Sequence, residues 1–128
     1  MASNRYDVND IDVAWLELPV AASEHIYSGN LVMVVEGTGY LVTAANTASG
    51  VLMGISRQEI DNSDGSDGDL DCEVIPLWNL KFIELDASSP DDTWIGDVMY
   101  VSDEHTATQT AGNGVTIGRC VGWSTDRV

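Results

Sequence analysis

Two copies of one short sequence motif, called the glycine phrase below, favour a fold of strands joined by tight turns. The phrase is Gly, then Asn or Asp, then a short apolar run; it begins at Gly29 and Gly96, and a Gly-x-x-x-Gly block follows each copy at residues 50–54 and 114–118. Gly beside Asn or Asp favours a turn, because Gly accepts positive φ and the short polar side chain bonds its own backbone. The apolar runs are too short for globular helices and rich in Val and Met, which is typical of buried strands. Either the chain contains an internal repeat, or a common turn-into-strand phrase occurs twice by chance.

Further apolar stretches extend the β prediction over most of the chain. Period-two alternation is clearest at residues 73–85, where Trp78, Leu80 and Phe82 share one face. A helix start near Ser89 is followed too soon by a glycine to give more than a turn or so. The sequence therefore predicts an all-β fold with at most short helical turns.

The N-terminal region has a different pattern. The first ten residues are polar and aperiodic, which alone would give a disordered arm. An apolar alternation then begins at Ile11 and slips phase after Trp15, which fits a bulged strand, an edge strand closed by Pro19, or a segment that orders on a partner. We therefore expect an extended arm over residues 1–20 and a single β domain over residues 21–128.

Length and cysteine content point to one domain made in the cytoplasm. At 128 residues the chain can bury a core of its own without metals, cofactors or disulfides. No apolar run approaches the length of a membrane span, and the N-terminus lacks the order of a signal peptide, so no membrane partner is expected. Cys72 and Cys120 are widely separated with no Cys or His at ligand spacing, so we expect buried free thiols.

The charge balance is unusual and excludes one class of function. The chain has 21 acidic residues against 5 basic ones, a formal net charge of −16, and Lys81 is its only lysine. Such a surface repels phosphate backbones, which argues against a reader of nucleic acid. Self-repulsion should destabilise the compact state at low salt, whereas at about 1 M salt the Debye length is only about 3 Å. The composition therefore indicates adaptation to concentrated salt; the competing interpretation is a moderately acidic mesophilic surface protein.

An Asp- and Gly-rich stretch at residues 61–73 raises the question of a calcium site. Hard cations prefer several carboxylate oxygens from one flexible segment. The EF-hand register fails, however, because it would place Ser63 and Gly65 at ligand positions. We expect a solvated acidic turn, in which the weak metal candidates are Asp64, Asp67, Asp69 and Asp71.

The sequence shows no catalytic constellation. His25 and His105 are isolated in polar, turn-like contexts, and motifs for nucleophiles, zinc, phosphate or dinucleotides do not occur. The four tryptophans have no regular spacing that would mark a sugar platform and are more typical of core or interface positions. We therefore expect a protein that is not an enzyme and has no cofactor.

Four stretches of the chain are similar to capsid decoration (cement) proteins of tailed viruses. They are residues 21–32, 49–55, 95–101 and 114–122, so that the likeness covers roughly residues 20 to 123. The resemblance implies a small β-barrel or β-tulip domain that forms homotrimers at three-fold and quasi-three-fold positions on the outer capsid surface of the virion. The long loop at residues 61–71 and the acidity depart from the family pattern, and the acidity suggests a host that lives in strong brine.

The resemblance also implies partners and a binding segment. In that family the arm orders on the major capsid protein, often by adding a strand to its edge. The corresponding capsid-binding candidates in this chain are Tyr6, Val8, Ile11, Val13 and Trp15. The alternative function is a cation- or glycan-binding β module on a virion fibre or cell surface, for which the acidic loop and the tryptophans would be responsible.

Overall fold

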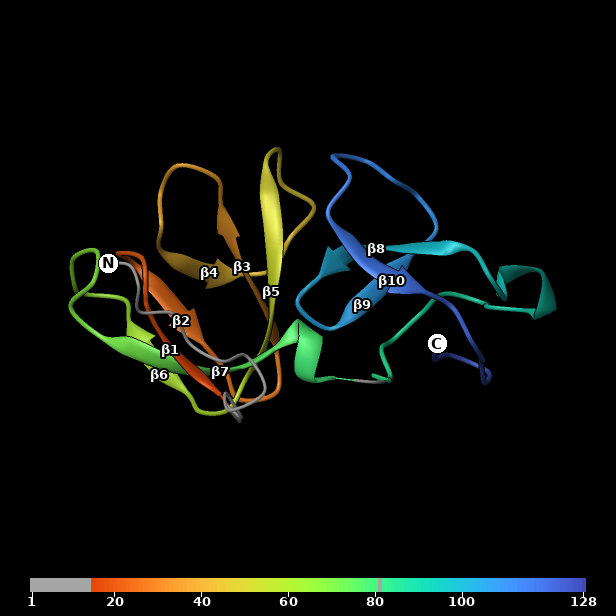
Figure 1. Ribbon diagram of the computed structural model, residues 1–128, viewed down its shortest axis with the longest axis horizontal. Helices are drawn as coiled ribbons and strands as arrows, with labels where there is room; N and C mark the ends of the chain where they lie inside the picture. Colours follow the sequence, from red (N-terminus) through yellow and green to blue (C-terminus); the bar gives the residue numbers. More distant parts are fainter. Residues whose placement is uncertain (1–14, 81) are drawn as a thin grey trace, which may run out of the picture.

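The chain folds into short β-strands with only two 3-10 turns between them, as the computed structural model shows for residues 15–80 and 82–128 (Figure 1). The prediction of an all-β fold with at most short helical turns is confirmed. The strands are β1 (Leu16–Pro19), β2 (Glu24–Ile26), β3 (Leu31–Val35), β4 (Leu41–Thr43), β5 (Gly50–Ser56), β6 (Ile60–Asn62), β7 (Asp71–Pro76), β8 (Val98–Asp103), β9 (Thr106–Thr108) and β10 (Thr116–Arg119). The 3-10 turns are η2 (Leu77–Asn79) and η3 (Asp92–Trp94).

The strands form three antiparallel sheets. Five strands pair in the order β1-β7-β5-β3-β4, three in the order β10-β8-β9, and β2 pairs with β6. The outer strands of the five-stranded sheet meet only at a parallel bridge between Val20 and Leu41. Pro19, which has no N–H to continue a ladder, ends β1 just before that bridge. Within the described residues the sheets therefore stay open and do not make the closed barrel that the resemblance implied.

Part of the predicted arm belongs to the folded domain. Residues 16–19 form an edge strand, β1, which pairs with β7 along its whole length. Val20, which follows, is completely buried. Within the described residues, β structure is therefore present from Leu16 and not only from residue 21, and Pro19 closes the edge strand as the proline pattern indicated.

One hydrophobic core joins the two lobes that Figure 1 shows side by side. Leu31 and Met33 of β3 face this shared core, whereas Val32 between them faces a second cluster, within the lobe of β1–β7. Because both faces of β3 are buried, its sequence is a continuous apolar run and not an alternation. The shared core consists of Leu31, Met33, Ala44, Leu52, Leu85, Met99, Val101, Ala107, Val115 and Cys120.

The two copies of the glycine phrase adopt the same local structure. In each, a turn glycine with positive φ leads into a strand that is central to an antiparallel trio, β4-β3-β5 or β9-β8-β10. Gly29 has φ 86° and its N–H donates to the Ser56 carbonyl; Gly96 has φ 90° and its N–H donates to the Cys120 carbonyl.

Even the irregularity of the ladder is shared between the copies. In the first, Val32 pairs with Gly54 and Met33 with Leu52, so that Met53 is the extra residue of a β-bulge. In the second copy, Met99 pairs with Gly118 and Tyr100 with Thr116, so that Ile117 is the corresponding extra residue. This agreement in register between the two copies favours an internal repeat over chance.

One predicted strand is shorter than expected, and the predicted helix start gives the single turn that was expected. The strand predicted for residues 73–85 ends at Pro76, because proline removes a ladder donor and the chain turns into η2. Trp78 and Phe82, predicted to share one face of that strand, are 70% and 77% exposed. The helix start is the single turn η3, capped by Asp91, whose side chain accepts from the Thr93 N–H.

Candidate functional site

Only one residue of the predicted capsid-binding set lies within the described part of the chain. Tyr6, Val8, Ile11 and Val13 lie outside the described residues. Trp15 is 40% exposed at the start of the edge strand β1. The guanidinium of Arg57 lies 4.0 Å from its ring centroid and also pairs with Glu73 at 2.7 Å. This cation–π contact holds the exposed indole at the sheet edge, where a partner strand could reach it.

The four weak metal candidates lie in or beside the exposed loop between β6 and β7: Asp64, Asp67, Asp69 and Asp71. Two of their carboxylates accept hydrogen bonds from backbone amides. Asp69 Oδ2 accepts from the Ser66 N–H of the loop itself at 2.9 Å, and Asp67 Oδ1 accepts from the Ala22 N–H, between β1 and β2, at 2.7 Å. Across residues 15–80 and 82–128, no three His, Cys, Asp or Glu side chains converge as metal ligands do. Asp69 thus supports the loop backbone, and Asp67 ties the loop to the segment before β2.

A buried asparagine fastens the same loop to the domain. Asn62, only 2% exposed, donates from Nδ2 to the Ala21 carbonyl at 2.9 Å and to the Ser66 carbonyl at 3.0 Å. A β-carbon at Gly65 would lie 1.9 Å from Asn62 Oδ1, so glycine is required there. The acidic loop is therefore built around Asn62.

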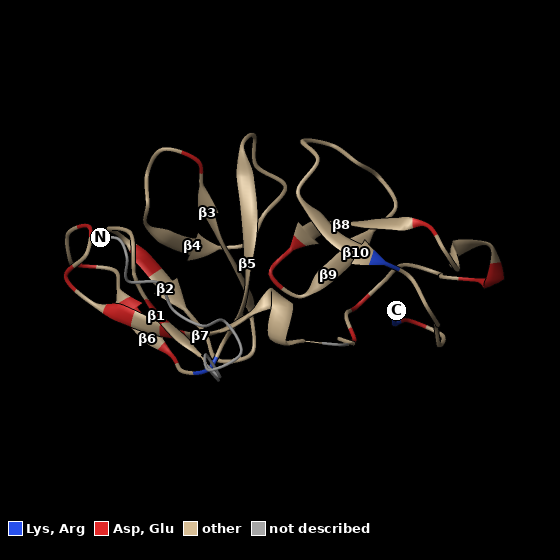
Figure 2. Ribbon diagram, in the orientation of Figure 1, with Lys and Arg blue, Asp and Glu red and all other residues tan. Residues whose placement is uncertain are grey.

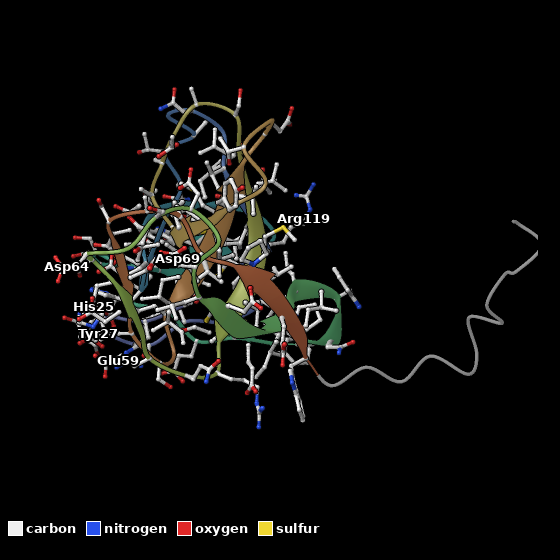
Figure 3. The ribbon with its side chains drawn as sticks, turned by 90° about the vertical axis from the view of Figure 1, so that its left-hand side faces the viewer. His25, Tyr27, Glu59, Asp64, Asp69 and Arg119 are labelled. Atoms are coloured by element: carbon white, nitrogen blue, oxygen red, sulfur yellow. The ribbon has the colours of Figure 1, made fainter. Side chains whose placement is uncertain are left out.

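His25 is not isolated, as the sequence suggested, but lies among acids. Its Nε2 is 2.6 Å from Glu59 Oε2, its Nδ1 is 3.9 Å from Asp61 Oδ2, and its ring stacks on Tyr27 with centroids 4.2 Å apart (Figure 3). Hydrogen bonds from Ser63 lower the pKa of Asp61, and the charge of His25 adds to that effect. Strands β2 and β6 bring these groups together, because His25 pairs with Asp61 across the two strands. The sequence does not reveal this contact, because the two residues are far apart along the chain.

His105 also has acidic neighbours, and all of them contact one nitrogen of its ring. Its Nδ1 lies 3.1 Å from Asp86 Oδ2, 3.5 Å from Asp103 Oδ1 and 3.1 Å from Thr106 Oγ1. Burial raises the pKa of Asp103, but hydrogen bonds from His105 and Thr106 outweigh this and lower it overall. The hydroxyl and the carboxylates meet the same ring nitrogen, so the imidazole cannot relay a proton between them as a catalytic triad does.

Sequence reasoning missed an apolar groove beside the three-stranded sheet. Met99, Ala107 and Ile117, one from each strand, line it together with Phe82 and Val121. Its volume is about 250 Å³, and a second hollow, which Phe82 and Val121 also line, continues it toward the C-terminal residues. The sequence predicts Phe82 within a strand. No local sequence pattern indicates that its ring is exposed to solvent.

No protein-family model matches this chain, and no curated protein or solved structure matches it either. The described residues contain no helix that combines the length and apolar character needed to cross a membrane.

Proposed function

We propose that this chain is a structural protein of the virion that decorates the outer capsid surface. It acts as a homotrimer at three-fold and quasi-three-fold positions, contacts the major capsid protein and stabilises the mature shell. The role is mechanical, because many modest contacts repeated over a shell reinforce it through multivalency. The chain acts without a cofactor and not as an enzyme.

The observation that carries this proposal is where the family-like stretches lie in the fold. Residues 21–32 and 49–55 supply β2, β5 and the start of β3, and residues 95–101 and 114–122 supply β10 and most of β8. The stretches that resemble decoration proteins thus include strands of both repeated trios, although not β4 or β9, and they also include β2, which belongs to neither trio. Among the described residues the histidine–carboxylate groups offer no competing catalytic arrangement, since His25 has no hydroxyl or thiol bonded to its ring and His105 has the wrong geometry.

The arm contributes the specific contact with the shell. β1 is an outer strand of its sheet, and Trp15 is exposed at its start. An extended segment that continues from an edge strand is suited to adding a strand to a partner's sheet. Tyr6, Val8, Ile11, Val13 and Trp15 are the apolar anchors in this proposal.

Co-sedimentation with expanded, undecorated shells from the host virus tests this function. We expect the full chain to sediment with the shells to saturation, and the double variant I11D/V13D to bind at least tenfold more weakly. The matched control is Leu70→Asp, which adds charge at an exposed leucine outside the arm. A full chain that stays in the supernatant at every salt concentration would contradict the proposal.

The alternative is a cation- or glycan-binding module, and its cation-binding form gains no support from the acidic loop. Asp67 and Asp69 already bond backbone amides, and the described acids do not converge. Calorimetry with calcium separates the two functions, since a binding module would show saturable, tight uptake.

A further inference from the structure

The apolar groove exposes side chains that a strongly charged protein would normally bury. Phe82 is 77% exposed, Val121 68% and Trp123 43%, and all three line the groove or its continuation. Trp123 is held at the rim by a hydrogen bond from its Nε1 to Asp92 Oδ1 at 2.8 Å. A contiguous apolar surface of this kind marks a binding site.

The charge at the groove indicates what kind of segment would cover it. Arg119 lines the groove, and its Nη1 donates to the Gly96 carbonyl at 2.8 Å. Arg57 and Arg127 are each paired with carboxylates, but Arg119 has no carboxylate within ion-pair distance among the described residues. Figure 2 shows this basic position on β10, in a chain whose visible charge is mostly acidic. The groove therefore suits a segment with both apolar and acidic side chains.

The path of the chain brings such a segment to the groove. β1 and β7 are antiparallel, and Leu16 pairs with Val74. The start of β1 therefore lies beside the end of β7, where Pro76 leads into η2. Leu77 of η2 is itself a wall of the groove. Residue 8 lies seven positions before Trp15. At about 3.3 Å per extended residue, the chain from residue 8 to Trp15 spans up to about 23 Å.

We propose that residues 8–14 of the chain's own N-terminal segment bind in this groove. Within it, residues 10–13 alternate between acidic and apolar side chains. Ile11 and Val13 share one face of an extended segment and pack against the apolar lining, and Asp10 or Asp12, which alternate with them, pairs with Arg119. This binding goes beyond the proposed function and stands without it. If the segment also adds to the shell, it must first leave the groove, so the two partners compete for it.

The test uses the full chain with a nitroxide spin label at N9C, a polar position outside the apolar anchors. The native thiols, Cys72 and Cys120, are buried, so the label is confined to the introduced cysteine. We expect amide NMR signals of residues 118–122 to lose most of their intensity, because the label lies near the groove. Signals of residues 36–39, in the β3–β4 turn, should keep theirs. Equal broadening at both places, or none at residues 118–122, would overturn the proposal.

Three variants in the N9C background identify the contacts. Phe82→Asp and the double variant I11D/V13D should each abolish the broadening, and Arg119→Gln should reduce it. Leu70→Asp, which adds the same charge at a leucine outside the groove, should leave it unchanged. Because Phe82 is largely exposed, its replacement leaves the core intact and tests the groove alone.

Mixing isotope-labelled chains with spin-labelled chains identifies the source of the segment. Broadening that appears only within one molecule supports the proposal. Broadening that passes between molecules would assign the groove to the arm of a second copy and overturn the intrachain assignment. Failure of this inference leaves shell binding unaffected, since co-sedimentation measures shell binding separately.

Discussion

At the scale of single residues, equivalent positions of the two repeats carry different constraints. Gly54 and Gly118 both follow the bulge residue in their strands. Gly54 is buried with φ +156°, and a β-carbon there would lie 2.0 Å from the Ile75 carbonyl oxygen. A β-carbon at Gly118 would meet nothing within 4 Å. The difference arises because β5 has β7 on its second side, whereas β10 is an edge strand.

Replacing these two glycines by alanine should therefore have unequal effects. We expect Gly54→Ala to lower the free energy of unfolding by about 2 kcal/mol or more, through backbone collision and strain. Gly118→Ala should change it by less than about 0.5 kcal/mol. Chemical denaturation of both variants at constant salt checks this. Equal losses would mean that the two strands do not differ in their neighbours as described.

Cys72 provides a second residue-level prediction. Burial, and to a lesser degree the charge of Glu73, raises the pKa of its thiol to about 11. The thiolate is the reactive form, so at pH 8 the folded thiol should be almost entirely protonated and unreactive. We expect a thiol-specific reagent to modify Cys72 only under denaturing conditions. Rapid modification of the native protein would contradict the buried placement.

At the scale of elements, Asn62 fastens the acidic loop to the domain through its hydrogen bonds to the Ala21 and Ser66 carbonyls. We expect Asn62→Ala to lower the free energy of unfolding by about 1–3 kcal/mol, because the partly buried carbonyls of Ala21 and Ser66 lose their donor. Asp64→Asn, a change at an exposed loop position, is the matched control and should be nearly neutral. Thermal melts with and without calcium measure both. A loop organised by metal would instead show calcium-dependent stability and a large effect of Asp64→Asn.

The elements also show what the sequence could predict. The turns at Gly29 and Gly96 were predictable because glycine and its polar neighbour determine them locally. The end of the strand at Pro76 was missed because a strong period-two pattern continues past it, although proline stops the ladder. The groove was not predictable, since the exposure of Phe82 and Val121 depends on how distant elements pack. The same holds for the carboxylates around His25.

At the scale of the whole molecule, charge governs stability. A formal net charge of −16 opposes the compact state through self-repulsion, and salt screens that repulsion. We expect the melting temperature to rise steeply with sodium chloride up to molar concentrations. A flat response would favour the moderately acidic mesophilic interpretation. Potassium chloride serves as the control for effects specific to sodium.

The whole molecule is also the scale at which the proposed function is tested. Two strand trios share one core, and an N-terminal segment precedes the edge strand. The most direct measurement is the copy number of this chain in purified virus particles, determined by quantitative mass spectrometry. A copy number close to that of the major shell protein is the result we predict. Absence of the chain from intact particles would contradict the decoration function.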